Sequence, residues 1–151
     1  MTEVHQLVHE ALDRLREKRS GCFVHNEAAA ELLEHGREAI SAIENEVLGL
    51  AAEGRRPRDL ESVMVIYSQL LRRYEAGDQG VSFLRRLPQS FREVALKGAC
   101  GAWHLHFPMP CVLPSLMRLY LEEILACGTD EERSTAKRIL ERDEEVGLKG
   151  S

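Results

Sequence analysis

The sequence has few aromatic residues and no excess of positive charge. Aromatic side chains make up 5% of the 151 residues, and 20 basic against 25 acidic residues give a net charge of -5. A negatively charged chain is repelled by phosphate backbones and by anionic lipid, and sparse aromatics offer little surface for stacking bases. We therefore expect no membrane partner, and a nucleic-acid partner is disfavoured.

Paired cysteines and an export signal are also missing. The start of the chain, residues 1–5, lacks the basic and apolar pattern of a secretory signal. No CxxC pair occurs among the four cysteines, which lie at positions 22, 100, 111 and 127. Reduced thiols in a cytoplasmic protein are the simplest interpretation of this pattern, so we expect a cytoplasmic location.

No hydrophobic run is suited to cross a membrane. The longest uncharged stretch extends over residues 98–117, but it contains Pro108, Pro110 and Pro114. Three prolines would break a membrane-spanning helix. The stretch is better interpreted as a buried helix followed by a rigid loop.

Apolar residues recur at spacings of three and four along most of the chain, and no run alternates convincingly as a strand. This periodicity predicts an all-α fold of about eight helices, and short connections predict antiparallel helical hairpins that stack. We expect a single all-α domain over residues 1–143 and an acidic, flexible tail over 144–151. The predicted helices cover residues 2–18, 26–35, 37–53, 58–76, 79–87, 90–104, 112–127 and 129–142.

Two capping boxes are the sharpest local signals. Ser90 and Glu93 form one candidate pair, and Thr129 and Glu132 form the other. In each pair a hydroxyl and a carboxylate lie three residues apart, so each side chain can accept a hydrogen bond from an unpaired backbone N–H. Both pairs predict helix starts.

One segment resembles a known family of helical repeats. Residues 28–40 (AAAELLEHGREAI) join an alanine-rich helix through Gly36 to an acidic and aliphatic helix start. This junction is similar to those between HEAT-type repeats, with weaker echoes near Gly80 and Pro114. The steps of 44 and 34 residues compare with a repeat length of about 40. The resemblance implies a short α-solenoid with a scaffold or adaptor role, and an irregular helical bundle is the alternative.

Charge is segregated along the chain. Residues 55–97 hold nine basic and five acidic side chains, whereas the segments on either side are both net acidic. Stacked hairpins could gather the central arginines into a basic patch for an acidic protein or a phosphate backbone. The alternative is that these side chains only complement helix ends and solvate loops. The candidate patch consists of Arg55, Arg56, Arg58, Arg72, Arg73, Arg85, Arg86 and Arg92.

The sequence shows no catalytic motif such as a P-loop, GxSxG or GxGxxG. His104, His106 and Cys111 are candidate ligands for zinc, but their spacing is weak and a fourth ligand is not evident. We predict instead a proline-stiffened loop, no metal site and no cofactor.

The leading hypothesis is a non-enzymatic module that binds a protein partner through a helical surface, and the segregated charge also allows homo-oligomers. The alternatives are nucleic-acid binding through the arginine block and a metal-dependent enzyme around His104 and His106.

Overall fold

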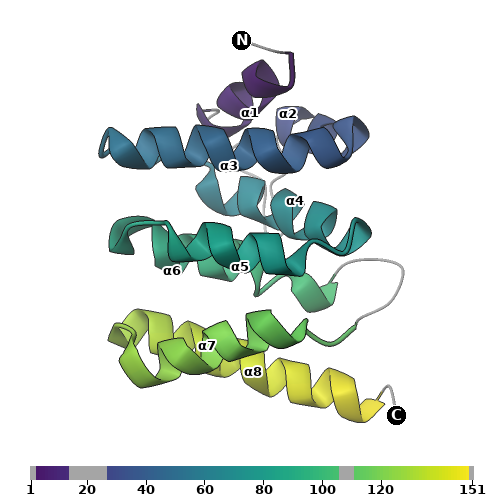
Figure 1. Cartoon of the computed structure of the whole chain (residues 1–151), viewed down its shortest axis with the longest axis vertical. Coiled ribbons are helices and arrows are strands. Elements are labelled where there is room, and N and C mark those ends of the chain that lie inside the picture. Colours follow the sequence, from purple (N-terminus) through teal and green to yellow (C-terminus); the bar gives the residue numbers. More distant parts are fainter. Residues whose placement is uncertain (1–2, 14–26, 106–110, 150–151) are drawn as a thin grey trace, which may run out of the picture.

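The structure, a computed structural model, describes residues 3–13, 27–105 and 111–149 (Figure 1). Within these residues the chain forms eight α-helices, two short 3-10 helices and no strand, which confirms the predicted all-α fold class. The α-helices are α1 (Glu3–Asp13), α2 (Glu27–Leu32), α3 (Arg37–Ala52), α4 (Leu60–Arg73), α5 (Gly77–Arg85), α6 (Gln89–Ala99), α7 (Ser115–Cys127) and α8 (Asp130–Lys149). The 3-10 helices are η1 (Leu33–His35) and η2 (Trp103–Leu105).

The helices alternate between two layers that run the length of the molecule. Each helix packs against its hairpin partner, as α1 does with α2, α3 with α4, α5 with α6, and α7 with α8. Contacts between every second helix join α2, α4, α6 and α8 into one layer, and α1 contacts α3 and α5 contacts α7 in the other. Figure 1 shows α3, α5 and α7 one above another, with the N-terminal and C-terminal hairpins at opposite ends of the stack.

Helix α4 lies at the centre of this stack and is buried on almost every side. It packs against α2, α3, α5 and α6, and nearly all residues from Leu60 to Leu71 are buried. A helix surrounded by other helices needs apolar side chains all round. This explains why residues 63–67 have the composition of a strand although they are helical.

One of the two predicted capping boxes is correct. The Thr129 hydroxyl accepts a hydrogen bond from the N–H of Glu132 (3.1 Å), and Glu132 Oε1 accepts one from the N–H of Thr129 (3.0 Å). The Ser90 box is wrong, because α6 begins at Gln89 and is preceded by Pro88, with no side-chain cap. Proline fixes a backbone φ suited to a helix start, so α6 begins directly after Pro88 and Ser90 lies inside the helix rather than at its N-cap.

The C-terminal helix is longer than its periodicity predicts. Helix α8 continues to Lys149 rather than ending at residue 142, so it includes residues 144–149 of the predicted tail. A buried residue, Asp143, lies just beyond the predicted end of the helix.

Two glycines occupy positions where a side chain would not fit. Gly36, at the predicted repeat junction, has a φ of 64°, and a Cβ there would lie 2.7 Å from the Tyr74 hydroxyl oxygen. Gly98 lies where α6 crosses α4, and its Cβ would lie 2.5 Å from Met64 Cβ and 2.8 Å from the Glu61 carbonyl oxygen. Because Gly98 has no side chain, α6 can pack this closely against α4.

The Gly98→Ala variant should be less stable by about 1–3 kcal/mol, because the new methyl group meets backbone atoms that cannot easily shift. The matched control is Gly49→Ala in α3, where nothing lies within 4 Å of the added Cβ. This control should gain roughly 0.5–1 kcal/mol from helix propensity. Urea denaturation of both variants measures the difference, and equal stabilities would contradict the close packing of α4 and α6.

Candidate binding groove

The structure places the predicted arginines at two opposite edges of the stack. Arg55, Arg56 and Arg58 lie in the connection before α4, whereas Arg72 and Arg73 lie at its far end. The 14 residues of α4 separate these two groups by about 20 Å along the helix axis, at 1.5 Å per residue. The eight arginines therefore do not share one surface.

The first edge also includes the end of α5 and the start of α6, and three of its six arginines have acidic neighbours. Arg85 donates two hydrogen bonds to Glu123, at 2.6 and 3.0 Å, and these bonds lower the pKa of the Glu123 carboxyl. Arg92 Nε lies 3.5 Å from Glu132 Oε2, and Arg55 Nη1 lies 3.5 Å from Glu53 Oε2. Charge pairing therefore reduces the positive potential along this edge.

Three arginines at this edge, Arg56, Arg58 and Arg86, are exposed, and their side chains have no hydrogen bond or ion pair within the described residues. Arg56 lines a shallow hollow with α6 residues and with Glu131 of α8. These three side chains are the part of the predicted patch that is available to a partner.

The two arginines at the other edge donate hydrogen bonds to backbone carbonyl oxygens of the two 3-10 helices. Arg72 Nη1 donates to the Trp103 carbonyl oxygen (3.0 Å), and the guanidinium lies 6.0 Å from the centre of the indole ring. Arg73 Nη1 donates to the Leu33 carbonyl oxygen at 3.5 Å. Arg72 therefore anchors the 3-10 helix that follows α6.

The His104 side chain takes part in a buried hydrogen-bond network, and its Nδ1 has no hydrogen-bond partner among the described residues. Its side chain is buried, and Nε2 lies 2.9 Å from Asp143 Oδ1. The same oxygen accepts the N–H of Leu113 (2.7 Å), and Asp143 Oδ2 accepts Arg118 Nη1 (2.6 Å). We call these four residues the Asp143 network. It ties η2, the start of α7 and α8 together across the proline-rich connection.

Of the other two candidate ligands the structure describes only Cys111. Cys111 is exposed, and His106 lies outside the described residues. Within residues 3–13, 27–105 and 111–149 no group of three His, Cys, Asp or Glu side chains could hold a metal ion. Burial raises the pKa of the Cys100 thiol to about 12, so this cysteine stays uncharged at neutral pH.

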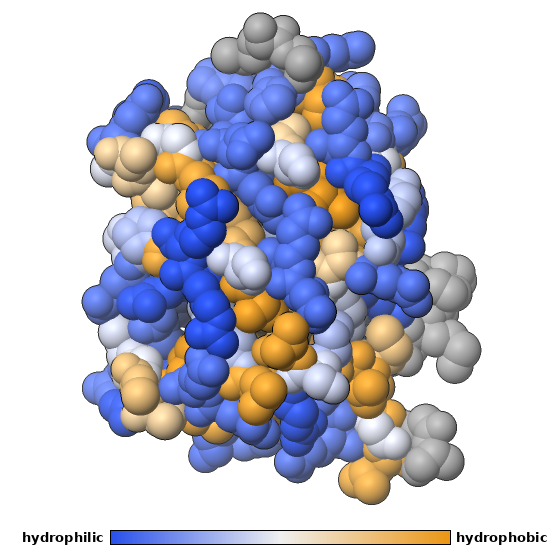
Figure 2. All heavy atoms as spheres, viewed as in Figure 1, coloured by the Kyte–Doolittle hydropathy of each residue, from blue (hydrophilic) through white to orange (hydrophobic). Residues whose placement is uncertain are grey.

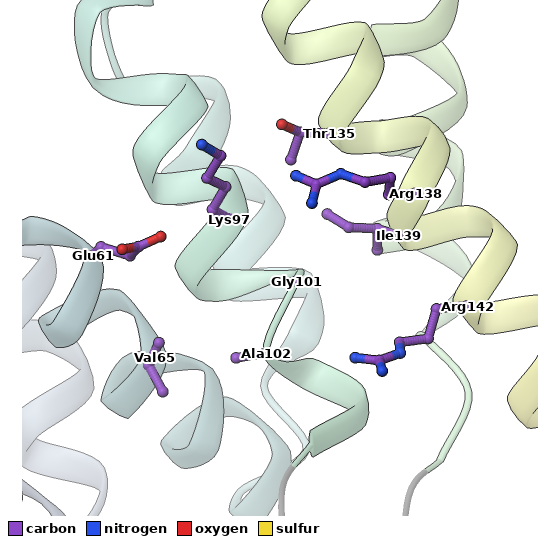
Figure 3. A pocket seen from close by; sticks show the side chains of 9 residues that line it. All are labelled: Glu61, Val65, Lys97, Gly101, Ala102, Thr135, Arg138, Ile139 and Arg142. Atoms are coloured by element: carbon purple, nitrogen blue, oxygen red, sulfur yellow. The ribbon is translucent and has the colours of Figure 1, made fainter. Parts of the chain in front are cut away.

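A groove of about 590 Å³ crosses the layer that contains α4, α6 and α8. Figure 3 shows Glu61 and Val65 on the α4 side and the α8 side chains on the opposite wall. Arg138 and Arg142 of α8 extend from this wall toward α6. The lining residues are Glu61, Val65, Lys97, Gly101, Ala102, Thr135, Arg138, Ile139 and Arg142.

The two α8 arginines that line the groove leave positive charge unbalanced there. Lys97 Nζ lies 2.8 Å from Glu93 Oε1, which neutralises it. Arg138 and Arg142 are exposed, and neither side chain has a hydrogen bond or ion pair in the described parts of the chain. Like charges four residues apart on one helix repel each other. An anion bound between them would remove this repulsion.

The groove arginines do not stand out in the sequence. Arg138 and Arg142 belong to a net acidic segment, and summing charge along the chain hides them. Arg138 and Arg142 are four residues apart, so they share one face of the helix, and Ile139 lies beside that face. This spacing indicates a basic face next to an apolar one. The meeting of α4, α6 and α8 is a tertiary feature that this spacing does not show.

The opposite face of the molecule carries exposed apolar side chains instead. Figure 2 shows hydrophobic atoms in the lower part of this face, over α7. Leu116 and Leu119 of α7 are 45% and 52% exposed. Among the described helices none is long and apolar enough to cross a membrane.

Comparison with known proteins adds no family to this description. No protein family, curated protein or solved structure matches the chain. The function must therefore be argued from the groove itself.

Proposed function

We propose that this protein is a non-enzymatic binding module that holds a segment of a partner protein in the groove between α4, α6 and α8. The observation that carries the proposal is the pair of unpaired arginines, Arg138 and Arg142, beside an apolar floor. Apolar surface provides affinity, and fixed charges provide specificity and orientation. A segment with negative charge next to apolar side chains fits both.

The chemistry of the groove supports binding rather than catalysis. Its lining includes no serine, cysteine or histidine among the described residues. The Thr135 hydroxyl donates a hydrogen bond to Glu93 at 3.5 Å. No histidine in the described lining of the groove could activate this hydroxyl as a nucleophile. The His–Asp pair that could resemble catalytic groups is the buried His104 and Asp143, which lies outside the groove lining.

The two-layer arrangement also supports the HEAT-type resemblance of residues 28–40. In stacked hairpins each pair covers the apolar face of its neighbour, and one layer offers a continuous surface for binding. Here α4, α6 and α8 belong to one such layer and form the groove. The proposal is therefore a short HEAT-like scaffold whose binding surface is this layer.

Charge reversal in the groove should abolish most of the binding. The probe is a fluorescein-labelled degenerate peptide library with a fixed central glutamate, followed by fluorescence anisotropy. Arg138→Glu/Arg142→Glu should weaken binding by at least roughly tenfold, because two favourable charge contacts become repulsive.

The matched control is Arg58→Glu/Arg86→Glu, which changes the net charge equally at exposed positions outside the groove. It should bind the library like the unmodified protein. Equal losses in the two variants would assign binding to overall charge and refute the groove. Tighter binding of single-stranded RNA than of peptide would favour the nucleic-acid alternative.

A further inference from the structure

The α8 wall of the groove carries two arginines on one face of the helix. Arg138 and Arg142 are one helical turn apart, and both extend toward α6 (Figure 3). One turn rises about 5.4 Å, so two long side chains can converge on a single small group. Lys97 adds little net charge because Glu93 neutralises it. In Figure 3 the Arg138 guanidinium lies level with Lys97 and the Arg142 guanidinium lies nearer Ala102, so an anion bound between them would draw the two exposed side chains together.

The opposite wall limits how much negative charge the groove accepts. Glu61 lies on the α4 side, with its carboxylate directed into the space between the helices (Figure 3). A run of several acidic residues across the groove would bring one of them near this like charge. A single compact anion at the α8 wall avoids the repulsion and still meets both arginines.

We infer that the α8 wall recognises a phosphorylated serine or threonine side chain of the partner protein; this rests on the proposed function. A phosphate group carries nearly two negative charges at neutral pH and three acceptor oxygens. It matches two guanidinium groups in charge and in donor geometry. A carboxylate carries one charge and two oxygens, so it leaves one arginine unbalanced.

The phosphate source is a protein side chain rather than a nucleic acid. The described lining of the groove contains no aromatic ring on which a base could stack. Val65, Ala102 and Ile139 supply an apolar floor instead, which suits the neighbouring side chains of a peptide. The net charge of -5 further disfavours a polyanionic backbone.

The experiment compares three degenerate fluorescein-labelled libraries that differ only at the central position: phosphoserine, glutamate or serine. The full-length protein should bind the phosphoserine library at least roughly tenfold more tightly than the glutamate library. Arg138→Lys/Arg142→Lys keeps both charges but loses the planar guanidinium donors. It should lose most of this preference while still binding the glutamate library. Arg58→Lys/Arg86→Lys is the matched control and should keep the preference.

The outcomes separate this inference from the proposed function. Equal binding of the phosphoserine and glutamate libraries through the groove would overturn the inference and leave the binding module intact. Binding of neither library would refute both. Inorganic phosphate at millimolar concentration that displaces the phosphoserine library completely would show that a free phosphate suffices and would also overturn the assignment to a side chain.

Discussion

Asp143→Ala is expected to lower the free energy of unfolding by about 3 kcal/mol. Removing one partner of a buried ion pair typically costs about 3–5 kcal/mol, because the other groups remain buried and unpaired. Here His104 and the N–H of Leu113 lose their acceptor. The lower end of the range applies because Arg118 is 38% exposed and keeps Glu122 and Glu144 within 3.6 Å.

Urea denaturation followed by circular dichroism measures this loss. The control is Glu145→Ala, an exposed residue of the same helix, which should change stability by less than about 0.5 kcal/mol. Asp143→Asn should fall between the two, because the amide oxygen can still accept one hydrogen bond. If Asp143→Ala were as stable as Glu145→Ala, the Asp143 network would not join α8 to the rest of the stack.

Trp103→Ala is expected to cost about 3–5 kcal/mol, the typical loss for a large aromatic side chain in a core. Trp103 is buried, with only 4% of its surface exposed. It also supports the Arg72 guanidinium, which lies 6.0 Å from its ring centre. The alanine variant loses both the packing and the cation–π contact.

The control for this variant is Trp103→Phe. The indole Nε1 has no hydrogen-bond partner among the described residues, so phenylalanine loses volume but no hydrogen bond. Its expected cost is therefore well below that of alanine, by the same denaturation measurement. A phenylalanine variant as unstable as the alanine variant would show that the indole N–H is needed.

The helices could be predicted from the sequence because their apolar stripes are continuous. Leu60, Met64, Tyr67 and Leu71 repeat at helical spacing and are all buried, so local periodicity and tertiary packing agree. Only one of the two capping boxes forms, because the Thr129 box caps α8 whereas α6 begins directly after Pro88 and leaves Ser90 inside the helix. A helix start can be stabilised in several ways, and sequence alone does not choose among them.

The Asp143 network and the groove arise from contacts between distant segments. His104 and Asp143 are 39 residues apart, and the sequence analysis interpreted the first as a candidate metal ligand. Asp143 follows Ile139 by four residues and so lies on the apolar face of α8. An acidic residue on such a face indicates a buried partner. The identity of that partner depends on how the last two hairpins pack.

The central claim is that a partner segment binds between α4, α6 and α8. The most direct test is a titration of ¹⁵N-labelled protein with the phosphoserine and glutamate libraries, followed by amide chemical shifts. We expect the largest shift changes at residues 97–102 and 135–142, and we expect them to vanish in Arg138→Glu/Arg142→Glu. Changes confined to residues 53–59 and 85–92 would contradict the claim and return the binding site to the edge that carries the predicted arginine patch.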